Sequence, residues 1–96
     1  MPGTSRSVTV ATTPVKLASA RPPHARTWMT VAMPSGDVPT VYYALGVPTV
    51  SPANGTPLYG GDVLTVENSG TSKPAANELW AVTGSGSVDL IVAEGA

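Results

Sequence analysis

Few side chains in this sequence are of the types that perform acid-base or metal chemistry, and they are dispersed. His24 is the sole histidine, and it lies between Arg21 and Arg26 in an Arg-Pro-Pro-His-Ala-Arg segment. A catalytic triad or a multi-histidine metal site would have to be built around this single imidazole. The absence of cysteine excludes disulfides and thiolate metal sites. We therefore interpret His24 as a solvated loop histidine beside two arginines, placed to touch a partner.

Acidic residues are the other source of acid-base chemistry, because two nearby carboxylates can act as acid and base. The chain has six of them: Asp37, Asp62, Glu67, Glu78, Asp89 and Glu94. All six fall in predicted turns or on the predicted exposed side of strands, where carboxylates favour solubility and protect sheet edges. The Gly84 to Gly86 segment is typical of a hairpin rather than of a phosphate-binding loop. We predict no enzyme activity, no cofactor, no metal site and no small-molecule substrate.

The charges are unevenly distributed along the chain. Residues 1 to 30 carry four cations and no acid, and the remainder carries Lys73 against six acids, so the two parts have formal charges of +4 and −5. This split either steers one end of the molecule toward an acidic surface or arises by chance. Five cations in a chain of net charge −1 do not make a nucleic-acid-binding face. The sequence contains no run of about 18 apolar residues, so no membrane span is predicted. Its first residues also lack the apolar run of a secretion signal.

Short strands must position these side chains, because the sequence lacks helical periodicity. Ten prolines and ten glycines are spread over the 96 residues, and no stretch between them repeats apolar residues at helical spacing. Short runs rich in Val, Thr, Tyr and Trp, bounded by Gly, Pro, Asn or Ser, are typical of strands. The predicted strands are Ser7 to Ala11, Val15 to Leu17, Thr27 to Met33, Thr40 to Leu45, Pro57 to Tyr59, Val63 to Glu67, Leu79 to Thr83 and Val88 to Ala93.

Alternation within these runs predicts one buried face for each strand. Met29 and Val31 share a side that excludes Trp28, and the run 88 to 92 alternates in the same way. Asn54-Gly55 and Gly60-Gly61-Asp62 offer the positive φ angles of tight turns, and Gly84 to Ser87 lies between two predicted strands as a hairpin turn should. We predict an all-β fold with one domain over residues 7 to 96, a small β-sandwich or jelly-roll-like barrel of seven to eight short antiparallel strands. A flexible N-terminal arm is predicted at residues 1 to 6.

The large rings indicate an interaction surface. Trp28 lies opposite the predicted buried face of its strand, and one of the adjacent Tyr42 and Tyr43 must point away from the core that the other enters. A ring left near the surface favours an interface. The alternative is that the second face is itself the interior of a two-sided or strongly curved sheet. With 11% charged residues, the surface depends on hydroxyl and backbone groups or on cover by a partner.

The order of the short motifs extends over nearly the whole chain. It runs Val8-Thr9-Val10, Thr13-Pro14-Val15-Lys16-Leu17, an Arg-Pro-containing loop, Thr27-Trp28-Met29-Thr30-Val31, Val41-Tyr42-Tyr43, Asn54-Gly55-Thr56-Pro57-Leu58, Gly60-Gly61-Asp62-Val63-Leu64-Thr65-Val66, Leu79-Trp80-Ala81-Val82 and Val88-Asp89-Leu90-Ile91-Val92. This series resembles the small β-sandwich accessory proteins of tailed-phage virions, which include capsid decoration or cement proteins. The resemblance covers Ser7 to Glu94 and consists of strand and turn composition rather than an invariant site. The connection from Asn68 to Asn77 is longer than the family pattern usually has, and its role is open.

The resemblance implies a virion protein that acts after shell assembly. Such proteins bind the outer surface of the capsid, often as trimers, and bridge neighbouring copies of the major capsid protein. We therefore expect a homotrimer on the capsid exterior, made in the host bacterial cytoplasm. The residues expected to contact the capsid are Arg6, Arg21, His24 and Arg26, and those expected to support self-association are Trp28, Tyr42 and Tyr43.

Two other functions are compatible with the sequence. In the first, the chain is a head- or tail-fibre attachment module that binds a host glycan or protein, with surface rings as stacking platforms. In the second, it is a small hydrolase, which would need two carboxylates close together in a pocket. Copy number per virion separates the fibre module from the decoration protein.

Overall fold

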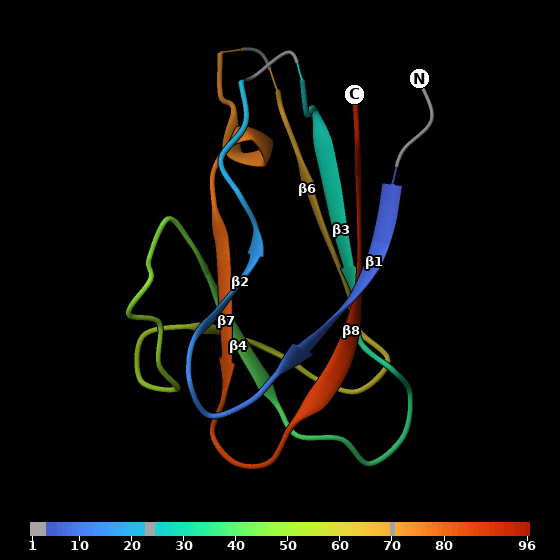
Figure 1. The fold of residues 1–96 in the computed structure, drawn as a ribbon, viewed down its shortest axis with the longest axis vertical. Helices are drawn as coiled ribbons and strands as arrows, with labels where there is room; N and C mark the ends of the chain where they lie inside the picture. The colour runs from blue at the N-terminus through green and yellow to red at the C-terminus, as the bar shows by residue number, and fades with distance from the viewer. Residues whose placement is uncertain (1–3, 23–24, 70) are drawn as a thin grey trace.

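Two antiparallel sheets packed face to face form the fold in the computed structural model, which describes residues 4–22, 25–69 and 71–96 (Figure 1). In these residues the elements are β1 (Thr4–Val10), β2 (Val15–Ala18), β3 (Trp28–Ala32), β4 (Val41–Leu45), β5 (Thr56–Leu58), β6 (Val63–Glu67), the 3-10 helix η1 (Pro74–Ala76), β7 (Leu79–Thr83) and β8 (Val88–Gly95). The first sheet has the strand order β1-β8-β3-β6 and the second the order β2-β7-β4-β5. The predicted all-β sandwich is confirmed. No helix within the described ranges has the length and apolarity needed to cross a membrane.

Each predicted strand has a counterpart in the described chain. β6 and β7 match the predicted ranges residue for residue, because their Val, Leu and Thr runs end at clear turn residues. The largest difference lies in β1, which begins at Thr4 instead of Ser7. Thr4 pairs with Glu94 and Arg6 pairs with Val92, so β8 holds this segment in the sheet. The flexible arm predicted for residues 1 to 6 is corrected from Thr4 onward, and residues 1 to 3 lie outside the described residues.

The core lies between the sheets and follows the predicted alternation. Met29 and Val31 of β3, and Leu90 and Val92 of β8, are fully buried. Because phenylalanine is absent, aliphatic side chains and methionine fill most of the interior. The buried members of the cluster are Val10, Leu17, Ala18, Met29, Val31, Met33, Val41, Leu58, Val66, Ala75, Leu79, Ala81, Val88, Leu90 and Val92.

Turns join the strands as the glycines predicted, with one exception. Gly61 and Gly86 adopt φ angles of 85° and 71°, which L side chains rarely adopt. The hydroxyl of Thr83 donates a 2.8 Å hydrogen bond to the Gly86 carbonyl and closes the β7-β8 hairpin. Gly55 has no such φ angle, and its requirement is space instead. A Cβ atom there would lie 2.8 Å from the Cβ of Tyr42.

Residues 46–55 fold over the outer face of the second sheet. Val50 in this loop is buried, and so is Val82, which β7 directs away from the main core. Gly55 lies between Tyr42 of β4 and Val50 of the loop, since a Cβ at Gly55 would be within 3 Å of both side chains. The loop therefore makes a second, smaller buried cluster on this face.

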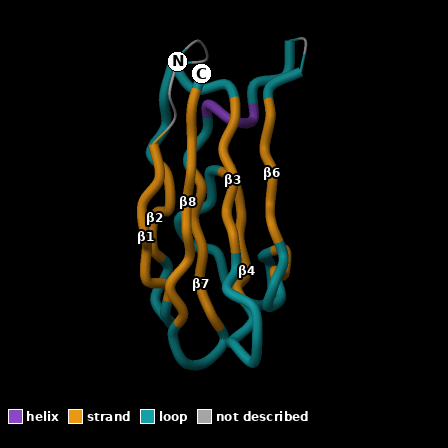
Figure 2. Tube along the Cα trace, turned by 90° about the vertical axis from the view of Figure 1, so that its right-hand side faces the viewer, coloured by secondary structure: helices purple, strands orange, loops and turns teal. Residues whose placement is uncertain are grey.

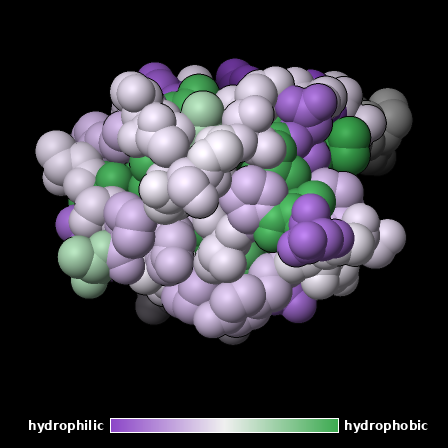
Figure 3. All heavy atoms as spheres, turned by 90° about the horizontal axis from the view of Figure 1, so that it is seen from below, coloured by the Kyte–Doolittle hydropathy of each residue, from purple (hydrophilic) through white to green (hydrophobic). Residues whose placement is uncertain are grey.

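No segment among the described residues covers the outer face of the first sheet in this way. Figure 2 shows its strands side by side, with the two ends of the described chain meeting at one end of the molecule. The opposite end, which includes the turns 33–40 and 84–87, has a mostly weakly polar surface with small hydrophobic areas (Figure 3). Because few residues of the sequence are charged, these surfaces consist largely of hydroxyl, glycine and aliphatic groups.

Candidate functional site

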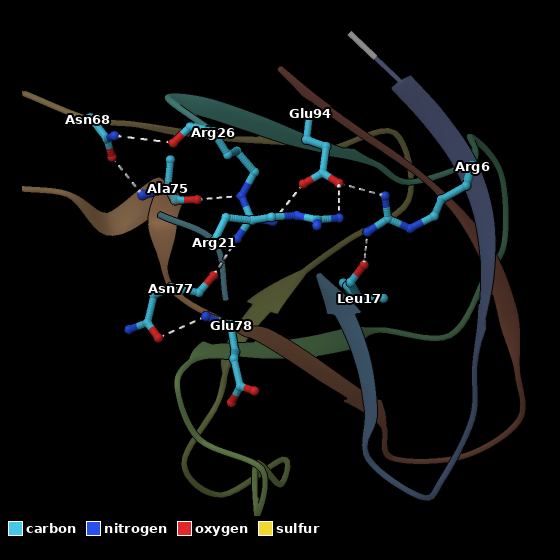
Figure 4. Close-up of polar contacts among 9 residues, drawn as sticks. All are labelled: Arg6, Leu17, Arg21, Arg26, Asn68, Ala75, Asn77, Glu78 and Glu94. Atoms are coloured by element: carbon cyan, nitrogen blue, oxygen red, sulfur yellow. Dashed lines mark hydrogen bonds and ion pairs between the residues drawn. The ribbon is translucent and has the colours of Figure 1, made fainter. Parts of the chain in front are cut away.

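An arginine cluster around Glu94 closes one end of the sandwich (Figure 4). Inward positions on β8 alternate through Leu90 and Val92, and the next inward position is Glu94. Its Oε2 accepts a 2.6 Å hydrogen bond from Nη1 of Arg26, and its Oε1 lies 3.2 Å from Nη1 of Arg6. Nη2 of Arg21 lies 3.6 Å from the same Oε1 atom. One carboxylate thus joins cations from β1 and from the connection between β2 and β3.

Arg26 is a buried anchor, with 1% of its surface exposed. Its Nε donates to the carbonyl of Ala75, its Nη1 to Glu94 and its Nη2 to the carbonyl of Asn77 at 2.8 Å. The side-chain oxygen of Asn68 accepts from the backbone N–H of Ala75 at 3.0 Å and holds that segment in place. The long connection between β6 and β7, whose role the sequence left open, therefore supplies carbonyl acceptors to Arg26.

Arg6 and Arg21 form the accessible part of the cluster. Their side chains are 39% and 51% exposed. Arg6 also donates through Nη2 to the carbonyl of Leu17, which ties the β1 edge of the first sheet to β2 of the second. The backbone N–H of Arg21 donates to the carbonyl of Ala76 at 2.9 Å. The Arg6 guanidinium group is thus held by a hydrogen bond to the scaffold, whereas Arg21 is anchored through its backbone and its side chain extends to the surface.

The electrostatics of the cluster favour the ionised form of Glu94. Burial by itself raises the pKa of this carboxyl, because it removes water from the charged form. The hydrogen bond from Arg26 and the positive charges of Arg26, Arg6 and Arg21 act in the opposite direction. Together they outweigh burial and hold the pKa of Glu94 below its usual value.

Of the four residues expected to contact the capsid, the three that the structure describes differ in their accessibility. Arg6 and Arg21 remain accessible, whereas Arg26 is enclosed and is corrected to a structural role. His24 lies outside the described residues. Glu94 was predicted to be exposed and is buried instead, because it continues the inward row of β8. Extending the alternation of Leu90 and Val92 by one step would have found it.

The three rings expected to support self-association lie in three different environments. Tyr43 packs against the main core, and Tyr42 lies on the opposite side of β4, where residues 46–55 cover it in part. One tyrosine therefore points away from the core, as predicted. Trp28 is half-buried on the outer face of the first sheet, and its ring occupies the space that a side chain at Gly95 would need. Of the three, Trp28 borders the uncovered sheet face.

That uncovered face presents hydroxyl and aliphatic side chains in rows across the strands. Ala32 lies between Val63 of β6 and Ile91 of β8, and these two neighbours are 63% and 50% exposed. The next row consists of Thr65, Thr30, Ala93 and Ser5. Contiguous apolar groups on a surface with few charges are typical of protein-protein contact sites. We call the row Val63-Ala32-Ile91, together with this second row, the flat face.

Within the described ranges, no group of three or more histidine, aspartate or glutamate side chains is placed to hold a metal ion. Comparison of the chain with protein-family models, with curated proteins and with solved structures found no match.

Proposed function

We propose that this protein is a structural component of a tailed-phage virion that binds the outer surface of the capsid and bridges neighbouring capsid subunits. It acts as a scaffold with binding surfaces and has no catalytic role. The flat face is the observation that carries the proposal. Val63 and Ile91 expose apolar side chains beside Ala32 in a sheet held rigid by pairing on both sides of β3 and β8.

The architecture supports this proposal in two further ways. The motif order that resembles virion accessory proteins implies a small β-sandwich, and the chain has that fold. A rigid sandwich that contacts two neighbouring subunits resists their separation, because the contacts must break together. Its binding also stabilises the assembled shell by mass action, since the site exists when the subunits are joined.

Placing a charge on the flat face tests the proposal. We expect the double substitution Ile91→Glu and Val63→Glu to lower the number of copies bound per virion at least tenfold, because burying unpaired carboxylates at a contact costs about 2 kcal/mol or more. Both side chains face solvent in the free protein, so the fold should survive, as circular dichroism would verify. Ser85→Glu, in the exposed β7-β8 turn, is the matched control. A full complement of the doubly substituted protein on purified virions would contradict the proposal.

A fibre attachment module is the second candidate, and the position of Trp28 favours it. A half-buried ring beside an uncovered sheet face provides a stacking surface for a glycan. Quantitative gel analysis of purified virions separates the two candidates, because a decoration protein is present in many copies and a fibre module in few.

A further inference from the structure

A small pocket opens at the arginine end of the sandwich. Its volume is about 230 Å³, and its lining consists of Thr4, Arg21, Ala25, Arg26, Glu94, Gly95 and Ala96. Alanine and glycine contribute little side-chain volume, so the charged groups dominate the chemistry of the pocket. Arg6 adds a further guanidinium group to the same carboxylate from β1.

The cluster around this pocket has an excess of positive charge. Counting side chains only, Arg6, Arg21 and Arg26 supply a formal charge of +3 and Glu94 supplies −1, which leaves +2. Arg26 directs its donors to Glu94 and to two backbone carbonyls, so its hydrogen-bonding capacity is largely used within the fold. The excess charge therefore acts outward through Arg6 and Arg21.

Arg21 keeps donors available for a ligand. A guanidinium group has five N–H donors. Within the described chain, the ion pair of Arg21 with Glu94 spans 3.6 Å, which is longer than a hydrogen bond. The side chain is 51% exposed while its backbone N–H is fixed to Ala76. The side chain of Arg21 is thus a hydrogen-bond donor that faces an open pocket, and its backbone is held in place.

We infer that this pocket receives a carboxylate from an acidic side chain of a partner protein, with Arg21 as its main ligand and Arg6 as the second. The inference rests on the proposed function in one respect, namely that the partner is a protein surface. Arginine binds a carboxylate through two parallel hydrogen bonds, and Glu94 shows that this cluster already accommodates one such group. Arg26 acts as a positioning residue, because it fixes Glu94 and the adjoining connection without reaching solvent.

A single negative group suits this site better than a nucleic-acid backbone. The sequence contains five lysines and arginines, and three of them converge here. Binding of a polyphosphate chain needs a stripe of positive charge along a face. Lys16 is directed elsewhere, since it pairs with Glu78 at 3.6 Å and lies over the ring of Trp80. The three arginines are thus gathered around one point, Glu94, as a site for a single carboxylate requires.

A binding titration tests the inference directly. The probes are a short glutamate-rich peptide and inorganic phosphate, added to the full chain while the Arg Nε–H signals are followed by NMR. We expect the peptide to shift the Arg21 signal and to bind about tenfold more weakly to the Arg21→Gln variant, since hydrogen bonds to charged groups contribute of this order. Lys16→Gln is the matched control, because Lys16 is similarly exposed and also makes a 3.6 Å ion pair. Equal weakening in both variants, or phosphate binding as tight as peptide binding, would overturn the inference.

A second measurement separates this inference from the proposed function. Virions are prepared with the wild-type, Arg21→Gln or Lys16→Gln protein, and retained copies are counted after a salt wash. We expect selective loss of the Arg21→Gln protein. Full retention of that variant on decorated virions would overturn the carboxylate site and leave the proposed function intact. Absence of the wild-type protein from virions would overturn the proposed function, while the peptide titration still decides the pocket chemistry.

Discussion

Glu94 and Arg26 form a buried ion pair at a position where the strand pattern places apolar residues. Taking two charges out of water is unfavourable unless additional hydrogen bonds satisfy them. Arg26 meets this condition through its bonds to the carbonyls of Ala75 and Asn77. The pair therefore fixes how the β6-β7 connection, β8 and the segment before β3 meet.

Removing Arg26 should destabilise the fold more than removing either exposed arginine. We expect Arg26→Met to lower the free energy of unfolding by about 3 kcal/mol, because the buried carboxylate and two carbonyls lose their donor. Arg21→Gln should lower it by less than about 1 kcal/mol, since this partner is half exposed. Urea denaturation measures both values. Equal effects of the two substitutions would show that burial does not distinguish their roles.

Stability should fall in acid through Glu94. Because the folded state lowers the pKa of this carboxyl, ionised Glu94 stabilises the fold above the ordinary glutamate pKa of about 4.3. That contribution is lost as the pH falls from this value through the lower pKa of the folded state. The groups that face the carboxyl are Arg6 from β1, and Arg21 and Arg26 from the connection before β3.

The variant Glu94→Gln isolates this contribution. We expect the difference in unfolding free energy between wild type and Glu94→Gln to be largest near pH 7 and to shrink below about pH 4.3. Denaturation curves recorded from pH 7 to strongly acidic buffer provide the measurement. A difference that stays constant across this range would contradict the role assigned to the carboxylate.

At the scale of elements, the loop at residues 46–55 acts as a cover for the second sheet. Gly55 is the point of closest approach, with a substituted Cβ falling 2.8 Å from Tyr42 Cβ and 2.9 Å from Val50 Cγ2. We expect Gly55→Ala to destabilise the protein by about 1 to 3 kcal/mol through overpacking. In Gly84→Ala, the added Cβ lies 3.7 Å from Pro52 and should change stability by less than about 0.5 kcal/mol. Thermal unfolding of the two variants tests the contrast, and similar melting temperatures would argue against a tightly seated loop.

The first residues of β1 are a structural element as well. Deleting residues 1 to 6 removes the pairing of Thr4, Ser5 and Arg6 with β8 and the ion pair of Arg6 with Glu94. We expect faster hydrogen exchange in the second half of β8, because one of its two neighbouring strands is shortened. Unchanged protection there would mean that this end of β1 adds nothing to the sheet. Deletion is therefore a test of folding before it is a test of binding.

Strand positions were readable from the sequence because they depend on local signals. The β-branched runs and the Gly61 and Gly86 turns mark their own boundaries. The arginine cluster was readable in part, as a concentration of cations in the first 30 residues. Its buried partner was not found, because Arg26 and Glu94 are 68 residues apart and meet through the pairing of β3 with β8. The spacing of residues along the sequence does not reveal which residues of β3 and β8 pair.

At the scale of the whole molecule, the uneven distribution of charge along the sequence becomes an uneven distribution of charge in space. The cations at Arg6, Arg21 and Arg26 meet at one end, beside the C-terminal part of β8. Asp62 and Asp89 lie in the turn before β6 and at the start of β8, toward the other end of the 36 Å long axis. Such a separation orients the molecule as it approaches a charged surface. The flat face runs between these two ends. When charge turns one end of the molecule toward a charged surface, the flat face therefore stands roughly perpendicular to that surface.

The pairing of β1 with β8 also governs when the protein can fold during its synthesis. Arg6 and Glu94 are 88 positions apart, and β8 stands between β1 and β3 in the first sheet. A nascent chain that has not yet released β8 from the ribosomal tunnel leaves β1 and β3 without their shared neighbour. We expect ribosome-bound chains arrested before Val88 to be digested rapidly by protease, and chains in which Gly95 has emerged to resist it. Folding of this domain thus requires that β8 has emerged from the ribosomal tunnel.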